Sequence, residues 1–173
     1  MDPQTTVGCF GIQAGMRIAD FGSGSGFFTI FMAKLAGPDG LVTAIDVMDS
    51  ALDSVRAKAK AEALDNIDTI RSNLELPGSS GLADGSQDLV LLKNVLFQTE
   101  KKQEMLAEAN RVLKIAGKLA VIDWKKGADG LGPPDKLRTD TETIRQLAEN
   151  GGFNFIDFID ADVFHYGMMF KKV

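Results

Sequence analysis

The sequence predicts a three-layer α/β protein, in which helices cover both faces of a mainly parallel, doubly wound sheet. Stretches typical of strands and of helices alternate along the chain, and some strand stretches are apolar at every position, as at 89–92. Strands of that kind are buried on both faces and belong mostly to parallel sheets. With 173 residues, of which 45% are hydrophobic, we expect a single domain over 1–173 with a sizeable core.

The first half of the chain contributes three predicted strands. Residues 1–16 are a short, turn-rich segment, in which we expect no full lid. Leu52, Val55 and Ala59 recur at helical spacing and mark one face of a helix. In chain order, we predict a strand at 18–21, a helix at 27–36, a strand at 41–46, a helix at 50–64 and a strand at 67–71.

The second half adds four more predicted strands. In chain order, we predict a loop at 73–87, a strand at 88–92, a helix at 100–114, a strand at 118–124, a loop at 125–139, a helix ending at 150, and strands at 153–159 and 163–170. Thr139 and Glu142 have the spacing of a capping box for the last helix. The link 160–162 is far shorter than the roughly dozen residues of a parallel crossover, so the last two strands should form an antiparallel hairpin.

The composition argues against several classes of function. A net charge of −5 disfavours nucleic acid, whose phosphate backbone is bound through Lys and Arg. The single Cys9 cannot form an internal disulfide, and one cysteine with one histidine cannot supply a zinc cage, so we expect no metal site. No apolar run approaches the roughly 20 residues of a membrane span, and we see no signal peptide, so we expect a cytoplasmic protein.

Three glycines, Gly22, Gly24 and Gly26, follow the first predicted strand and precede a helix. Such a turn lets a ligand lie against bare backbone, and the helix start adds unpaired N–H groups that favour an anionic group. The dinucleotide fingerprint requires its third glycine at position 27, which is Phe27 here. A nicotinamide oxidoreductase is therefore a weaker alternative, and an ordinary strand-to-helix turn is another.

With Asp20 before it and Asp46 at the end of the next strand, this turn resembles the first motif of class I S-adenosylmethionine (SAM) dependent methyltransferases. The segments 124–134 and 163–172 are similar to small bacterial members grouped near ubiquinone/menaquinone and arsenite methyltransferases. The resemblance covers nearly the whole chain. It implies a Rossmann-like sheet of order 3-2-1-4-5-7-6 with strand seven antiparallel, and SAM as the cofactor. Arsenite enzymes rely on several cysteines, whereas this chain has only Cys9.

Residues just beyond the predicted strands are the cofactor-binding candidates, because open α/β sheets bind ligands outside the carboxyl ends of their strands. The resemblance implies that Asp46 accepts both ribose hydroxyls, that Asp20 lies near the cationic amino-acid end, and that Asn73 contacts the adenine edge. Each has a plainer alternative: a helix cap, a buried aspartate that holds the loop, and a turn asparagine. The predicted set is Asp20, Gly22, Ser23, Gly24, Gly26, Asp46, Val47, Asn73, Leu74, Asn94 and Val95.

The candidates for binding the methyl acceptor, the molecule that would receive the methyl group of SAM, follow later strands. Phe97 comes after the fourth strand and Trp124 ends the fifth, and each could equally pack in the core. An antiparallel seventh strand starts at the edge where the parallel strands end, which brings His165 and Tyr166 toward the acceptor. Both are catalytic candidates. His165 could act as a general base, or it could be a histidine hydrogen-bonded beneath a loop.

These features predict an enzyme that transfers the SAM methyl group to a small-molecule acceptor by in-line displacement. Two alternatives remain: a non-catalytic SAM-binding regulatory subunit, and an RNA or protein methyltransferase, which only the basic residues of the 125–139 loop suggest. Family members often have one or two helices that roof the site before the first strand, and residues 1–16 leave little room for them. We therefore expect an open site, covered by the 125–139 loop, a partner protein or a second copy in a homodimer.

Overall fold

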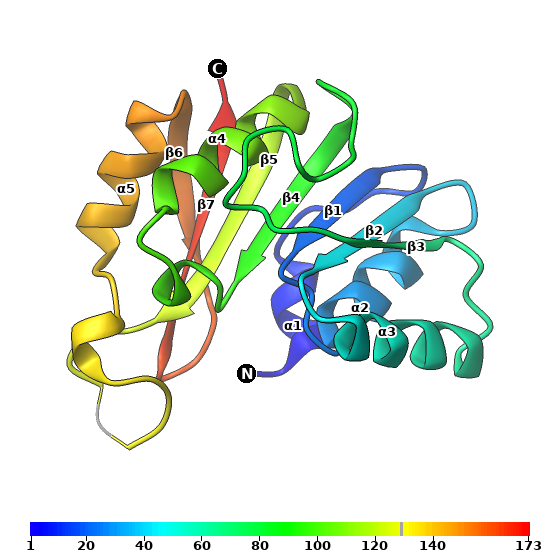
Figure 1. Cartoon of the computed structure of the whole chain (residues 1–173), viewed down its shortest axis with the longest axis horizontal. Coiled ribbons are helices and arrows are strands. Elements are labelled where there is room, and N and C mark those ends of the chain that lie inside the picture. The colour runs from blue at the N-terminus through cyan, green and yellow to red at the C-terminus, as the bar shows by residue number, and fades with distance from the viewer. Residues whose placement is uncertain (129) are drawn as a thin grey trace.

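The structure, a computed structural model, describes residues 1–128 and 130–173, and in these residues seven strands form one sheet (Figure 1). The strands lie in the order β3-β2-β1-β4-β5-β7-β6, which confirms the predicted order. Their bounds are β1 Arg17–Phe21, β2 Leu41–Asp46, β3 Ile67–Arg71, β4 Gln87–Lys93, β5 Leu113–Trp124, β6 Phe153–Ile159 and β7 His165–Lys172.

The first five strands are parallel, and the predicted hairpin of β6 and β7 closes the sheet. β1 is parallel to both β2 and β4, so the strand order reverses beside β1. β7 is antiparallel to β5 and to β6, because the link between β6 and β7 is too short to cross the sheet. Trp124 at the end of β5 pairs with His165 at the start of β7. The start of β7 and the carboxyl ends of the parallel strands therefore meet at one edge.

Helices lie on both faces of the sheet (Figure 1). Helices α1 (Pro3–Gly8), α2 (Phe27–Ala36) and α3 (Asp49–Ala61) lie on one side, and α4 (Lys102–Val112) and α5 (Thr141–Asn150) lie on the other. Along β4, Leu89 and Leu91 pack with residues of α1 and α2, whereas Val90 and Leu92 pack with residues of α4 and α5. This alternation explains why the strand is apolar at every position.

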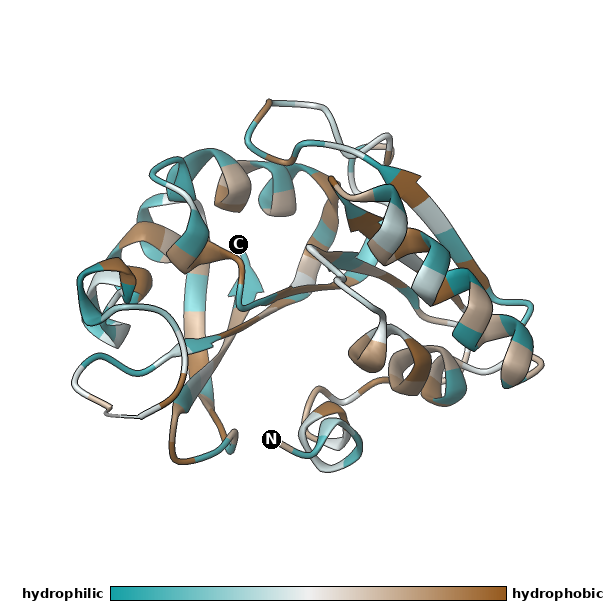
Figure 2. Cartoon of the chain, turned by 60° about the horizontal axis from the view of Figure 1, so that its bottom comes forward, coloured by the Kyte–Doolittle hydropathy of each residue, from teal (hydrophilic) through white to brown (hydrophobic). Residues whose placement is uncertain are grey.

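The buried residues of α3, α4 and α5 recur at helical spacing on one face of each helix. Figure 2 shows that hydrophilic and hydrophobic residues both occur along the helices. Short 3₁₀ turns, η1 (Leu96–Gln98) and η2 (Asp135–Leu137), follow β4 and β5. Within residues 1–128 and 130–173, no helix combines the length and the apolar character needed to cross a membrane.

The N-terminal segment contains a helix that the sequence analysis does not predict. The carboxylate of Asp2 accepts a hydrogen bond from the backbone N–H of Thr5 at 3.0 Å, and Pro3 occupies the first turn of α1. An aspartate followed by proline is a common helix start, since proline lacks the N–H that a first turn leaves unpaired. Val7 and Phe10 then pack into the core beside α2.

Two other local predictions are wrong. The cap of α5 is Asp140, whose carboxylate accepts from the backbone N–H of Thr143 at 2.8 Å, so Thr139 and Glu142 do not form a capping box. The helix predicted at 100–114 ends at Val112, and β5 begins at once with Leu113 instead of at 118. A bulge in the β4–β5 pairing absorbs the extra residues.

Candidate functional site

A cavity of about 860 Å³ opens at the carboxyl ends of β1, β2 and β4, where the strand order reverses. Its volume falls within the range of roughly 300–1,000 Å³ that small-molecule sites occupy. Most of the predicted site residues line it: Asp20, Gly22, Ser23, Gly24, Asp46, Val47, Asn73, Leu74, Asn94, Val95 and His165.

Asp46 ends β2 and is bonded to the glycine turn that follows β1. Its Oδ2 accepts from the backbone N–H of Gly24 at 2.9 Å, and its Oδ1 accepts from the backbone N–H of Met48 at 3.0 Å. A carboxylate oxygen has two acceptor sites, so each oxygen can still accept a ligand hydroxyl. Asp46 does not cap α3, because that helix begins at Asp49 without a side-chain cap.

The three glycines of the turn have different environments. A Cβ on Gly22 would approach a methyl of Val95 to 2.4 Å, and a Cβ on Gly26 would lie 2.8 Å from Val55 on α3. Gly24 has a φ of +53°, and its Cβ would meet nothing within 4 Å. Gly22 and Gly26 are therefore needed for close packing, whereas Gly24 leaves open space in the cavity. Gly26 itself does not line the cavity.

Asp20 is buried at the end of β1 and binds α2. The Oγ1 of Thr29 donates to Asp20 Oδ2 at 2.6 Å, so a hydroxyl, not the loop backbone, holds this carboxylate. Burial raises the pKa of Asp20 to about 6, although the bond from Thr29 and the positive charge of Lys93 oppose the rise. Asp20 also lines the cavity, so it can face a ligand while it anchors the helix.

Two asparagines shape the cavity wall. Asn73 accepts from the backbone N–H of Glu75 through Oδ1 at 3.0 Å, which is the turn geometry of the plainer alternative. Asn94, directly after β4, adopts a left-handed φ of 54°. Its side-chain Oδ1 is buried and has no hydrogen-bond partner in the described part of the chain. Buried polar atoms normally have partners, so Asn94 can accept a bond from a ligand.

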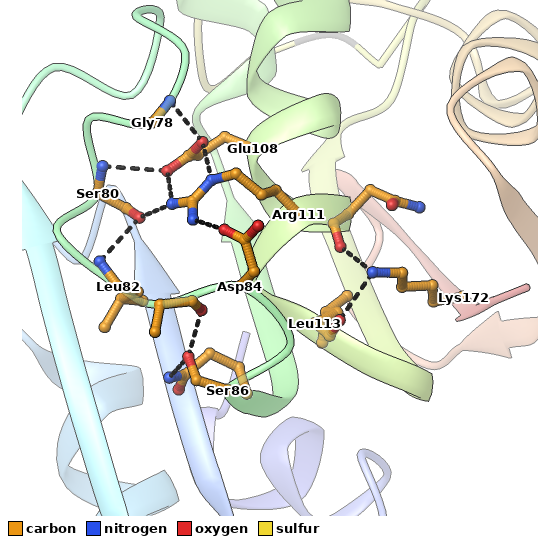
Figure 3. A network of polar contacts seen from close by, with 12 residues as sticks. Gly78, Ser80, Leu82, Asp84, Ser86, Glu108, Arg111, Leu113 and Lys172 are labelled. Carbon is orange, nitrogen blue, oxygen red and sulfur yellow. Dashed lines mark hydrogen bonds and ion pairs between the residues drawn. The ribbon is translucent and has the colours of Figure 1, made fainter.

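A polar network fixes residues 78–84, which follow Asn73 and form no helix (Figure 3). Glu108 on α4 accepts from the backbone N–H groups of Gly78 at 2.9 Å and Ser80 at 3.1 Å. The guanidinium of Arg111 donates to both oxygens of Glu108 and also contacts Asp84. Burial opposes ionisation of Glu108, but these bonds lower its pKa to about 2.

His165 begins β7 and lies in the cavity wall. Its Nδ1 lies 2.8 Å from Oδ1 of Asp162, and its ring packs against Trp124 in a tilted arrangement with centroids 4.0 Å apart. Burial lowers the pKa of His165, although the Asp162 carboxylate opposes the shift. A neutral ring that donates from Nδ1 keeps its acceptor lone pair on Nε2. That Nε2 is buried and has no partner in residues 1–128 and 130–173.

Comparison with known proteins matches this geometry to one family. The family model described as "Methyltransferase domain" matches residues 12–165. The chain belongs to the class I SAM-dependent methyltransferase family. The structure superposes on that of a SAM-dependent methyltransferase from Aquifex aeolicus with a TM-score of 0.89 and 26% identity, covering 99% of this chain and 90% of that one.

Curated methyltransferases are also similar in sequence. The ubiquinone/menaquinone biosynthesis C-methyltransferase of Pasteurella multocida is 32% identical over 163 residues, which cover 84% of this chain and 59% of that protein. The demethylmenaquinone methyltransferase of Listeria welshimeri is 35% identical over 113 residues, covering 65% of this chain and 46% of that protein. The chain thus spans about half the length of these two methyltransferases.

Three of the four acceptor-side candidates do not line this cavity. Tyr166 follows His165 on β7 and points to the other face, where it is buried in the core with α4 and α5. Trp124 lies behind His165 instead of in the cavity. Phe97 donates its backbone N–H to Asp123 at 3.1 Å, and the next residues, Gln98 and Thr99, line the cavity in its place.

The 125–139 loop does not roof the cavity in the part of it that the structure describes. The guanidinium of Arg138 donates to four backbone carbonyls of this loop and folds it onto itself; the acceptors are Lys125, Ala128, Leu131 and Pro133. Met1 and Pro3 line the cavity instead. The amino group of Met1 also forms an ion pair with Asp162 at 2.9 Å.

Several wall residues were missed by the sequence analysis: Met1, Pro3, Ser25, Phe27, Phe28, Met48, Ala51, Ser72, Glu75, Lys93, Gln98, Thr99 and Met105. Lys93 could have been predicted from the sequence, because, like Asp46, it is a charged residue that ends an apolar strand. Met1 and Pro3 could not, since their position depends on how α1 packs against α2.

Proposed function

We propose that this chain is a methyltransferase that binds SAM in the cavity and transfers its methyl group to a small-molecule acceptor. Family membership and the similarity to a SAM-dependent enzyme support the proposal. The observation that carries it is the carboxylate of Asp46, which ends β2 within hydrogen-bond distance of Gly24 and borders the open side of the glycine turn.

The residues around the cavity fit SAM in their chemistry. Asp46 can accept both ribose hydroxyls, and Val47 and Met48 beside it are more than half exposed, which suits a flat apolar base. Ser23 Oγ and Asn94 Oδ1 are buried in the cavity wall without partners in the described residues, and a polar ligand would satisfy both. We therefore assign the cofactor to the predicted set, except Gly26.

SAM, when bound, supplies an electrophilic methyl group on a sulfonium, and the protein's own task is mainly positioning. We assign one chemical role, that of general base, to His165. Its unpartnered Nε2 can accept the proton of an acceptor hydroxyl, while the bond to Asp162 holds the ring in the required tautomer. Burial lowers the pKa of His165 and so favours the neutral ring that a base requires.

The names of the related enzymes suggest an aromatic acceptor of the quinol type. Phe27 and Phe28 at the start of α2 both line the cavity, and Phe27 is 60% exposed. An aromatic ring could pack against them. The basic residues of the 125–139 loop do not line the cavity in the described chain, so they lend no support to an RNA or protein substrate.

Calorimetry with SAM and with its demethylated product, S-adenosylhomocysteine (SAH), tests the proposal. We expect dissociation constants on the order of micromolar. Turnover is followed as SAH formed from SAM with a water-soluble naphthohydroquinone as acceptor, beside simple phenols and amines. No SAH binding would refute the proposal. Binding without turnover on any acceptor would favour the regulatory-subunit alternative. Light scattering with and without SAH would show whether a second copy covers the opening.

A further inference from the structure

Lys93 is the last residue of β4, and its side chain lines the cavity. The amine lies 5.1 Å from the centroid of the Phe28 ring. In residues 1–128 and 130–173, this amine has no hydrogen bond and no carboxylate within ion-pair distance. Lysine amines elsewhere in the site region are engaged, as in Lys58, which donates to the carbonyl of Ser25 at 2.6 Å.

Three carboxylates attract the Lys93 amine, but none of them forms an ion pair with it. Asp20 on β1, Asp123 on β5 and Asp162 before β7 all favour its charged form. Burial acts more strongly and lowers the pKa of the amine. Partly buried charges normally acquire a direct partner, because an unpaired charge away from water is costly. A ligand that places an anionic group in the cavity would supply the direct partner that Lys93 lacks.

The groups beside Lys93 indicate which anion this is. Asp20 lies on the neighbouring strand, where β1 pairs with β4. Asn94 follows Lys93 directly and has a buried, unpartnered Oδ1. Asp20 and Asn94 provide acceptors for an ammonium group, and Lys93 provides a donor for a carboxylate. An ammonium and a carboxylate on one carbon form the zwitterion of an α-amino acid.

We propose that Lys93 binds the carboxylate of the methionine end of SAM and so makes the site selective for ligands that keep the whole amino acid. This inference rests on the proposed function. It gives Lys93 a role in binding the cofactor, separate from that of His165 in accepting a proton. An anionic group of the acceptor is the rival partner for Lys93, and the cofactor alone can distinguish the two.

The test compares SAH with 5′-methylthioadenosine, which has the same nucleoside and sulfur but lacks the amino acid. Calorimetry measures both ligands on the wild type, Lys93→Met and Lys93→Arg. The control is Lys60→Met, which changes an exposed lysine of α3 outside the cavity. We expect Lys93→Met to weaken SAH binding about tenfold and to leave the affinity for methylthioadenosine unchanged, since a charged hydrogen bond is lost from one ligand only.

Lys93→Arg should keep most of the preference for SAH, and Lys60→Met should keep all of it. Unchanged SAH binding in Lys93→Met would overturn the inference and leave the proposed function intact. Equal weakening of both ligands would also overturn it, because the effect would then be on the shape of the site. A wild-type chain that binds neither ligand would refute the proposed function together with this inference.

Discussion

Asp46 Oδ2 accepts a hydrogen bond from the backbone N–H of Gly24 at 2.9 Å, across 22 positions of the chain. The bond joins the end of β2 to the turn after β1. It therefore sets the shape of the glycine turn and leaves the carboxylate at the cavity surface. Replacing Asp46 should therefore both loosen the glycine turn and weaken ligand binding.

The first prediction concerns Asp46→Ala. We expect SAH affinity to fall at least about tenfold, because the ribose loses an ionised acceptor and Gly24 loses its partner. Calorimetry measures the affinity. Asp68→Ala, which changes an exposed aspartate of β3 outside the cavity, is the matched control and should bind as the wild type does. Wild-type affinity in Asp46→Ala would show that the ribose assignment is wrong.

The second prediction separates two glycines of the turn. Gly24→Asn places a side chain in open cavity space and should strongly weaken SAH binding with only a modest loss of stability, because asparagine tolerates the left-handed φ of +53° at this position. Gly26→Ala brings a Cβ to within 2.8 Å of Val55 at a φ of +82°, so it should lower the melting temperature instead. Thermal unfolding and calorimetry on both variants check this. If both variants changed SAH affinity and melting temperature to the same extent, the distinction between a binding role for Gly24 and a packing role for Gly26 would be wrong.

The third prediction concerns the network of Figure 3. Arg111→Ala leaves the buried carboxylate of Glu108 without its cation and should lower the free energy of unfolding by about 3 kcal/mol at pH 7. Because the folded pKa of Glu108 is depressed to about 2, the stabilisation is complete above its ordinary value of 4.5 and is lost as pH falls toward 2. Denaturant titrations should therefore show the difference narrowing in acid. A difference independent of pH would refute this account.

The fourth prediction uses the single histidine of the chain. NMR of the labelled imidazole should give a titration midpoint below the ordinary value of 6.5, because burial disfavours the charged ring. Turnover should rise with pH through that midpoint and then level off, since only the neutral ring can accept a proton. His165→Asn should lose turnover and keep SAH affinity. A variant with full turnover would exclude His165 as the base.

The fifth prediction concerns Tyr166. Its hydroxyl is buried without a partner in the described residues, and burial raises its pKa far above the ordinary range. Tyr166→Phe removes this unsatisfied group, so unfolding should occur at an equal or higher temperature. Turnover should not change, because the ring lies in the core. A large loss of turnover with an unchanged melting temperature would mean that the hydroxyl reaches the acceptor.

Local sequence patterns are enough to predict the strands, their alternation with helices and the final hairpin. These depend on local information: apolar runs, the spacing of Gly22 and Gly24, and a link too short to cross the sheet. The same information identified Asp46, because an acid that ends an apolar strand must emerge at the edge of the sheet. The end of α4 and the cap of α5 were predicted wrongly, since a bulge decides the first and a competing aspartate the second.

The set of side chains that share the cavity depends on strand pairing and helix packing, and local patterns do not predict it. His165 and Tyr166 are adjacent in sequence, yet one lines the cavity and the other is buried behind the sheet, because the pleat and the pairing with β5 set the face of each residue. Lys93, Asp162 and Met1 come from distant parts of the chain, and strand pairing and helix packing bring them to one edge. Contacts of this kind are non-local, so no pattern along the sequence records them.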